Sequence, residues 1–371
     1  MRHSDVVPRR IVLFGATGYT GRLVAEALVR ARARPVLAGR SSQNLAALGV
    51  ELGKGLDTAV ADVRRPESLL ELVQPGDVLV STVGPFETLG RPVVEAAIER
   101  GATYLDSCGE PAFLRCVFET LAPAAESAGV ALVPGCGFEF AVGNLAAWLA
   151  LESAGNLASG VEVGYFLNGR IRGASSVGAR ASVGAAVVAP HYAWRNGHLV
   201  EVRGGDQVRR FPVDGTTRAA VSIGALEHLA IPRLLPSIRE ISVYIGGPKS
   251  ERVARTAARV VAAAGRVPGV PPTVRWATRL PRTKAGPDES ERSRMSGFVA
   301  ATAFDVAGRE LRTVRLGRVN PYTFTGSFLA WAAMRTAAHP VVGAGALGPV
   351  EAFGLGSLVE GCVKAGLKTA G

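Results

Sequence analysis

The chain contains few cysteines, and their spacing is not that of a disulfide scaffold or a metal site. Four cysteines occur in 371 residues, without a Cys-x-x-Cys pair and without histidines at metal-ligand spacing. This pattern excludes zinc fingers and disulfide-stabilised secreted domains. It predicts a cytoplasmic protein that binds no metal and keeps its thiols reduced.

Long apolar runs are also missing. The charge-free stretch 319–334 contains asparagine, proline and glycine and is too short to cross a bilayer. The stretch 341–359 is interrupted by many glycines, a proline and Glu351. The first ten residues are polar and lead directly into an apolar strand, which is not the pattern of a signal peptide. We therefore expect no transmembrane segment, while contact with a membrane surface stays open.

Acidic residues are outnumbered by basic ones. Lysine and arginine number 42 against 31 acidic residues, which gives a net charge of +11. A basic surface attracts acidic ligands over long distances, and phosphorylated cofactors, coenzyme A thioesters and an acidic acyl carrier protein all qualify. The arginines are dispersed and no nucleic-acid-binding motif is present, so we expect no nucleic-acid partner.

A glycine-rich turn follows the first apolar segment. Residues 11–21 read Ile-Val-Leu-Phe-Gly-Ala-Thr-Gly-Tyr-Thr-Gly, with glycines at positions 15, 18 and 21. In a dinucleotide-binding unit, Gly15 allows the tight turn, Gly18 lets the backbone approach a pyrophosphate, and Gly21 lets the next helix pack on the strand. That helix, expected over 21–32, directs its N-terminal amides at the phosphates. The turn therefore predicts an NAD(P)-type cofactor.

The end of the second predicted strand indicates which cofactor binds. The strand 35–38 is followed by Gly-Arg-Ser-Ser at 39–42, with no acidic residue for a ribose 2′-hydroxyl. Arg40 can pair with the 2′-phosphate of NADP, and Ser41 can add a hydroxyl donor. Alternatively, Arg40 is an ordinary surface arginine and Ser41 caps the next helix. We favour NADP over NAD.

The first 145 residues alternate strand and helix. Strands are expected at 11–14, 35–38, 57–60, 78–83, 102–105 and 130–133. This order predicts an α/β fold, a Rossmann-type doubly wound parallel sheet, with ligands at the carboxyl ends of the strands. After the third strand, Asp62 either contacts the adenine or caps the helix that starts near Pro66. After the fifth, Cys108 either approaches the cofactor or is a buried thiol.

From Gly160 onward the pattern is that of an α+β domain with an antiparallel sheet. We expect hairpins joining 199–202 to 208–213 and 299–306 to 311–316, a strand at 241–245 and a helix at 251–264. The segment 275–294 is rich in arginine, proline, glycine and charged residues, and this composition predicts a mobile loop. The resulting division is a cofactor domain 1–145, a substrate or dimerisation domain 146–320, and a helical segment 321–371 that packs back on the cofactor domain.

Several motifs together resemble the saccharopine dehydrogenase-like oxidoreductases, and most closely their trans-acting enoyl reductase-like branch. They are Gly-Ala-Thr-Gly-Tyr-Thr-Gly at 15–21, Ala-Gly-Arg-Ser at 38–41, Ser-Thr-Val-Gly-Pro-Phe at 81–86, Tyr-Leu-Asp at 104–106, Gly-Glu at 109–110, the segment 135–138 and elements of 227–246. The resemblance implies a Rossmann domain, NADP and frequently a homodimer. Where this branch usually has Gly-Phe-Asp, the chain has Glu139 after Gly137 and Phe138.

The predicted cofactor-binding residues lie at the strand ends. They are Gly15, Thr17, Gly18, Tyr19, Thr20, Gly21, Arg40, Ser41, Asp62, Val83, Gly84, Pro85, Phe86 and Cys108. The segment from Gly84 to Phe86 is expected to form the floor for the nicotinamide, with Phe86 either stacking on the ring or lying in the core.

Hydride transfer usually needs a proton donor beside the acceptor carbon. No tyrosine has a lysine four positions later, which disfavours the short-chain reductase mechanism. The predicted catalytic residues are Glu110, Glu139 and Tyr192, with Tyr104, His191 and Tyr322 as further candidates, and solvent can supply the proton instead. Glu110 could orient ribose, substrate or water, or it could pair with a neighbouring arginine.

Three functions are compatible with these residues. The first is an NADPH-dependent reductase of a polarised C=C bond in an enoyl-type biosynthetic intermediate. The second is a saccharopine-type enzyme acting on a C–N bond, for which Arg170, Arg172 and Arg180 would bind substrate carboxylates. The third is a non-catalytic NADP-binding sensor or scaffold.

Overall fold

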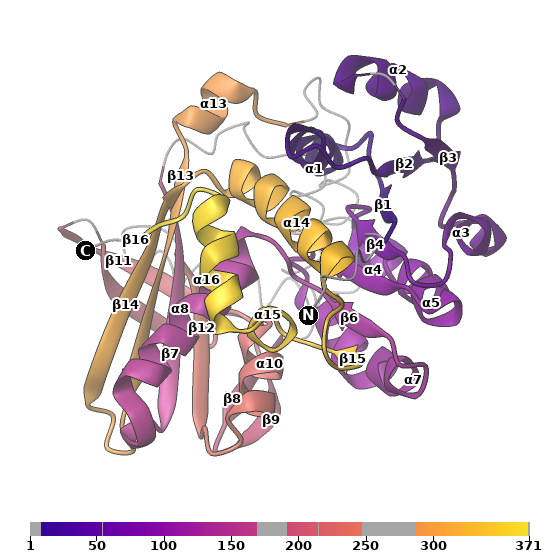
Figure 1. Cartoon of the computed structure of the whole chain (residues 1–371). Coiled ribbons are helices and arrows are strands. Elements are labelled where there is room, and N and C mark those ends of the chain that lie inside the picture. Colours follow the sequence, from indigo (N-terminus) through magenta and orange to yellow (C-terminus); the bar gives the residue numbers. More distant parts are fainter. Residues whose placement is uncertain (1–8, 54, 169–190, 214, 247–285, 370–371) are drawn as a thin grey trace, which may run out of the picture.

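The computed structural model describes residues 9–53, 55–168, 191–213, 215–246 and 286–369. They form two β-sheets with helices around and between them (Figure 1). The predicted helix at 251–264 and the three arginines at 170, 172 and 180 lie outside the described residues. Part of the predicted loop 275–294 is described, and it contains a short helix, α13 (Glu289–Ser293).

The first sheet is parallel and has seven strands, in the order β15-β6-β5-β4-β1-β2-β3. Its strands are buried on both faces except for the edge strand β3, as expected for a parallel sheet covered by helices. The order reverses between β1 and β4, and in folds of this kind such a switch point, at the carboxyl ends of the strands, is where ligands bind. The bounds are β1 Ile11–Phe14, β2 Val36–Gly39, β3 Thr58–Val60, β4 Val78–Ser81, β5 Thr103–Asp106, β6 Ala131–Val133 and β15 Gly345–Ala346.

The helices that connect these strands begin directly after the strand ends. Their bounds are α1 Tyr19–Arg30, α2 Ser42–Leu52, α3 Pro66–Leu72, α4 Phe86–Leu89, α5 Arg91–Arg100, α6 Pro111–Arg115, the π-helical η1 Cys116–Leu121, and α7 Ala122–Ser127. Several of them start with proline, whose missing N–H costs nothing in the first turn.

The second sheet has nine strands and is mostly antiparallel, with β12 and β7 as its parallel pair among the described residues. The path is β10-β11-β12-β7-β13-β14-β16, and β8 and β9 attach beside β12. The bounds are β7 Gly160–Asn168, β8 His191–Arg195, β9 His198–Val202, β10 Val208–Val213, β11 Thr216–Ser222, β12 Glu240–Gly246, β13 Ser296–Phe304, β14 Glu310–Val319 and β16 Lys368–Thr369. The predicted fold class, a Rossmann-type sheet plus a second α+β sheet domain, is confirmed.

One predicted hairpin is wrong. Strand β9 pairs with β8 and strand β10 pairs with β11, so 199–202 and 208–213 are not partners. The β8–β9 turn is made by Asn196 and Gly197, which both adopt positive φ. Asn-Gly is the strongest short-range hairpin signal, and it takes precedence over the Gly204-Gly205 pair that the prediction used. The other hairpin, β13 with β14, is confirmed.

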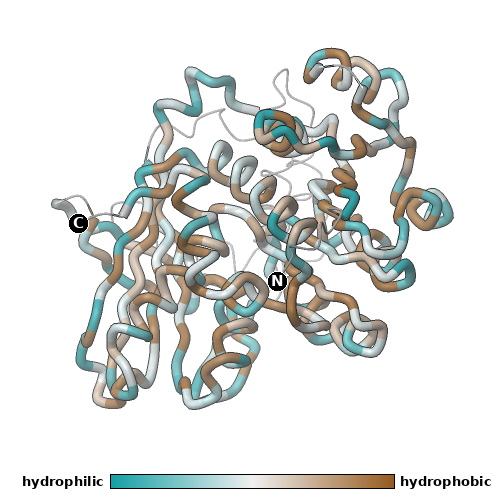
Figure 2. The backbone as a smooth tube through the Cα atoms, viewed as in Figure 1, coloured by the Kyte–Doolittle hydropathy of each residue, from teal (hydrophilic) through white to brown (hydrophobic). Residues whose placement is uncertain are grey.

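A long helix, α8 (Phe138–Ala154), was not predicted. It packs on β7, β13 and β14 and is buried on nearly all sides. A helix buried in this way has no polar face, so its sequence lacks the alternation that marks a surface helix. Figure 2 shows hydrophobic residues along the strands of both sheets and the helices between them.

The C-terminal segment connects both sheets. Helix α14 (Pro321–Ala338) packs along α1, and a Cβ on Gly326 would lie 2.7 Å from Leu23 Cβ, so the two backbones approach closely. Strand β15 extends the first sheet and β16 extends the second. The remaining bounds are η2 Gly155–Leu157, α10 Glu227–Leu234, α15 Pro349–Phe353 and α16 Leu355–Lys364. The exact domain limits at 145 and 320 stay a prediction.

Candidate functional site

The glycine-rich turn is packed too closely for a side chain at two of its three glycines. A Cβ on Gly15, which has φ +88°, would lie 2.7 Å from Thr82 Oγ1, and one on Gly21 would lie 2.1 Å from Gly15 O. Gly18 is the N-cap of α1, donates its N–H to Gly15 O at 2.9 Å, and leaves the first turn without a side-chain cap or an acidic residue. A pyrophosphate needs an open backbone at the N-terminus of a helix, and the 12-residue helix α1 provides one here.

The end of β2 carries the candidates for adenosine recognition. Arg40 is exposed, and Thr17 lies beside the strand end, where a Cβ on Gly39 would be 3.7 Å from Thr17 Oγ1. Ser41 caps α2, because its Oγ accepts the Asn44 N–H at 3.3 Å. The Asp62 carboxylate accepts the Arg64 N–H and closes a local turn, and the N-cap of α3 is Arg65.

The tip of β4 is tied to the glycine-rich turn. Thr82 donates its backbone N–H to Phe14 O at 3.0 Å and its hydroxyl to Gly15 O at 3.1 Å. Val83, Gly84 and Pro85 are partly exposed at this tip, whereas Phe86 is buried and packs on Phe113 with ring centroids 5.6 Å apart. The core interpretation of Phe86 therefore holds, and the three residues before it form the accessible surface.

Glu110 holds this loop in place. Its buried carboxylate accepts the backbone N–H groups of Phe86 and Glu87, each at 2.8 Å, and so caps the N-terminus of α4. The neighbouring Arg91 and Arg115 pair instead with Glu95, Glu119 and Glu201. Positioning the predicted nicotinamide floor is thus the structural task of Glu110, and a catalytic role for it stays a prediction.

We expect Glu110→Gln to weaken the fold and loosen the loop. The glutamine amide can accept one of the two N–H groups, but its own NH₂ would face the other, so a buried donor loses its partner. The cost is about 1–3 kcal/mol, measured as a lower thermal unfolding midpoint. Glu95→Gln, at an exposed pair on α5, is the matched control, and equal midpoints for the two variants would contradict this role.

Asp106, at the end of β5, connects three segments. It is buried, and its Oδ1 accepts the N–H groups of Cys108 and Gly135 at 2.8 Å, while Oδ2 accepts the Tyr104 hydroxyl at 2.8 Å. Burial raises the pKa of Asp106 to about 6. Its backbone O accepts the Cys136 N–H, which fixes the β6 tip beside that of β5.

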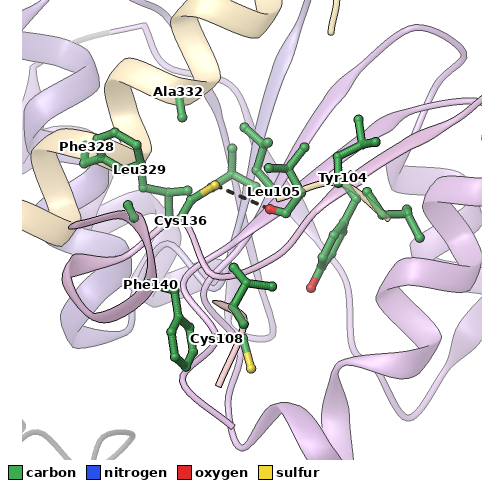
Figure 3. Packing of buried hydrophobic residues seen from close by; sticks show 14 of the residues in the cluster. Tyr104, Leu105, Cys108, Cys136, Phe140, Phe328, Leu329 and Ala332 are labelled. Atoms are coloured by element: carbon green, nitrogen blue, oxygen red, sulfur yellow. Dashed lines mark hydrogen bonds between the residues drawn. The ribbon is translucent and has the colours of Figure 1, made fainter. Parts of the chain in front are cut away.

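The cysteines at these tips are buried. Cys108 Sγ accepts the Glu110 N–H at 3.2 Å, and burial raises the pKa of both Cys108 and Cys136 well above their usual value. Figure 3 shows the two side chains in the packed interior near Phe140, with Cys136 hydrogen-bonded to the backbone O of Val133. Its burial favours the buried-thiol interpretation of Cys108, and its place among the cofactor-binding residues stays a prediction.

Of the three predicted catalytic residues, Glu139 is the one that solvent reaches. It lies in the first turn of α8, whose end is fixed by the Phe138 N–H donating to Thr325 Oγ1 at 3.0 Å. The protein packed around the carboxyl group raises the pKa of Glu139 above its usual value.

Tyr192 is in a different situation. It is buried on β8 and its hydroxyl donates to Pro111 O at 3.2 Å. Burial raises its pKa well above the usual value, and its ring packs edge-on against His228. These contacts attach the second sheet to the segment after Glu110. They make Tyr192 a packing residue in this structure, and its catalytic role stays a prediction.

Sequence reasoning missed one buried polar pair. Tyr165 on β7 donates its hydroxyl to Glu227 on α10, and both side chains are buried. Gly143 on α8 makes room for the pair, because a Cβ there would collide with both partners. Burial raises the pKa of Glu227 to about 8, so its carboxyl group is protonated at neutral pH. The sequence did carry one sign of this pair: the acidic residue Glu227 lies within the largely apolar segment 225–231.

Within the described ranges, no helix is long and apolar enough to cross a membrane. No group of three or more metal-ligating side chains is placed to hold an ion in that same part of the chain.

The sheet order and the glycine-rich turn at its switch point define a dinucleotide-binding α/β protein. Residues 11–133 match the family described as saccharopine dehydrogenase NADP binding domain, and this part of the chain belongs to it. The family comprises NAD(P)-dependent dehydrogenases and reductases. The predicted relation to saccharopine dehydrogenase-like proteins is thus confirmed.

Sequence relatives point to the branch that was predicted. Trans-acting enoyl reductases of Mycobacterium ulcerans and Mycobacterium leprae are each 37% identical to this chain over 134 residues. The match covers 35% of this chain and 32% of each relative, so the chain spans about a third of the length of these relatives.

Solved structures extend the fold similarity over the whole chain. Saccharopine dehydrogenase (L-Glu forming) from Saccharomyces cerevisiae has a TM-score of 0.59 at 14% identity and covers 98% of this chain and 100% of its own. Homospermidine synthase from Legionella pneumophila, in complex with NAD, has a TM-score of 0.59 at 10% identity, covering 98% and 91%. At these identities the similarity is one of fold.

Proposed function

We propose that this protein is an NADPH-dependent reductase that transfers hydride to a polarised C=C bond of an enoyl-type intermediate. The observation that carries the proposal is the glycine-rich turn, in which a side chain on Gly15 or Gly21 would collide with the protein while Gly18 leaves an exposed backbone at the start of α1. The partial identity to trans-acting enoyl reductases supports this reaction over reduction of a C=N bond.

The chain's own residues would divide the work as follows. The first turn of α1 holds the pyrophosphate, and Arg40 pairs with the 2′-phosphate. NADPH, when bound, supplies the hydride. Glu110 keeps the 84–86 loop in the position where the nicotinamide rests. Glu139, exposed in the first turn of α8, would donate a proton to the carbon next to the one that receives hydride.

The partner of such a reductase would carry negative charge. The net charge of +11 favours a thioester substrate on coenzyme A or on an acidic acyl carrier protein through long-range attraction. A homodimer and a cytoplasmic location stay predictions.

The first test is a fluorescence titration with NADPH and, separately, NADH. We expect NADPH to bind more tightly, and Arg40→Ala to weaken NADPH by roughly 10- to 100-fold, because one charge-assisted pair to a dianion is lost. NADH binding should not change. Arg30→Ala, an exposed arginine at the other end of α1, is the control. Equal losses for both cofactors in Arg40→Ala would overturn the 2′-phosphate assignment.

Turnover assays then distinguish the enoyl reductase from the saccharopine-type enzyme and from the non-catalytic protein. We expect NADPH oxidation with an enoyl thioester and deuterium transfer from 4-deuterated NADPH to the product carbon. Turnover with an imine or amino-acid-like substrate alone would favour the saccharopine-type reaction. Tight binding with no turnover of either class would favour a non-catalytic sensor or scaffold.

A further inference from the structure

A segment from the second half of the chain lies against the glycine-rich turn. Tyr19, the first residue of α1, donates its hydroxyl to Pro287 O at 2.6 Å. A Cβ on Gly286 would lie 2.5 Å from the Tyr19 ring, so the backbone packs directly on that ring. Figure 1 shows the helix that follows, α13, at the same end of the molecule as α1.

The backbone of this segment is fixed independently of its arginine side chains. Asp288 and Glu291 form a capping box at the start of α13. Asn320 donates from Nδ2 to the backbone O of Arg292 at 2.7 Å and to that of Met295 at 3.4 Å. Truncating an arginine on α13 therefore removes a charge and leaves the segment in place.

The Arg292 guanidinium contacts the side chain of Tyr19, the first residue of α1. Its Nη1 lies 3.3 Å from the Tyr19 hydroxyl oxygen and 3.3 Å from Pro287 O. Among the described residues, no carboxylate forms an ion pair with it, and its Nε and Nη2 have no hydrogen-bond acceptor. Arg294, two residues on, is directed away, with Nε and Nη2 hydrogen-bonded to Ser290.

We propose that Arg292 is a second arginine of the cofactor site and that it binds the pyrophosphate. This inference rests on the proposed function. The helix N-terminus supplies amide donors and no acidic residue in its first turn, and a guanidinium beside it adds the bidentate, permanently charged donor that phosphates prefer. Arg40 recognises the 2′-phosphate and so discriminates between cofactors, whereas Arg292 contacts a group that NADPH and NADH share.

The test compares Arg292→Ala, Arg294→Ala and Arg40→Ala in full-length protein, each titrated with NADPH and with NADH at two salt concentrations. We expect Arg292→Ala to weaken both cofactors by a similar factor of about ten, and to reduce the loss of affinity at high salt. Arg294→Ala, with the same charge change on the same helix, should match the wild type. Arg292→Lys should restore part of the affinity, since it keeps the charge and loses the bidentate fork.

The outcomes separate this inference from the function on which it rests. If wild-type protein binds neither cofactor, the proposed function fails. If the wild type binds and Arg292→Ala behaves like Arg294→Ala, the inference about Arg292 fails while the function stands. If Arg292→Ala weakens NADPH binding and leaves NADH binding unchanged, Arg292 contacts the 2′-phosphate, and the pyrophosphate assignment is wrong.

Discussion

Gly18→Val is expected to abolish measurable NADPH binding, a loss of at least about 100-fold, while the protein stays folded. Gly18 has φ −72° and ψ 167°, which valine adopts without strain. A Cβ there would meet one atom within 4 Å, Gly15 O at 3.2 Å, a tight contact that requires a shift of a few tenths of an ångström. The two methyl groups would then project over the first turn of α1, where the pyrophosphate has to approach the backbone.

Gly49→Val is the matched control for this experiment. Gly49 lies on α2, and a Cβ there would have no neighbour within 4 Å. Both variants should give the wild-type circular dichroism spectrum, and fluorescence titration should separate them. NADPH binding by a folded Gly18→Val protein at wild-type affinity would remove the glycine-rich turn from the cofactor site, and with it the main support for the proposed reductase.

The second large effect is a fall in stability with pH that depends on Glu227. Its folded-state pKa of about 8 lies above the ordinary glutamate value of 4.5, so the protonated form is favoured in the folded protein. The resulting stabilisation is fully present below the unfolded-state pKa and is lost as the pH rises through about 8. Between roughly pH 6.5 and 8 we expect the wild type to lose about 2 kcal/mol.

The pH window is chosen so that other buried groups contribute little. Burial raises the pKa of Asp106 to about 6 and lowers that of His228 to about 4, so both titrate mainly below the window. Glu227→Gln keeps an acceptor for the Tyr165 hydroxyl and cannot ionise, so its urea midpoint should stay flat. Glu360→Gln, at an exposed pair with Lys364, should retain the wild-type fall. An equally steep fall in Glu227→Gln would show that another group is responsible.

The parallel sheet was predictable because its signals are local. Each strand is a short apolar run followed by a turn or helix start, and the connections are short enough to impose one handedness and one order. The seventh strand was not predictable. Gly345 and Ala346 form a two-residue strand that joins β6 across more than 200 residues of sequence, and two residues carry no periodicity.

The second sheet shows where local reasoning fails. The prediction placed the hairpin turn at Gly204-Gly205 and overlooked Asn196-Gly197, which has the stronger turn chemistry. Helix α8 was missed for another reason. It is enclosed by the second sheet and other helices, so its apolar residues cover nearly every side and no amphipathic pattern exists to be read.

The site divides in the same way. Local sequence was enough to identify the glycine-rich turn, Arg40 in place of an acid, and the strand ends at which ligands bind, because these features depend on residues next to each other in the chain. Long-range packing was needed to show that Glu110 holds the 84–86 loop, that Tyr192 is buried, that Tyr165 and Glu227 pair, and that Arg292 contacts Tyr19 of α1. Those contacts join residues 23 to 273 positions apart, and their burial and hydrogen bonding exist only once both sheets have packed.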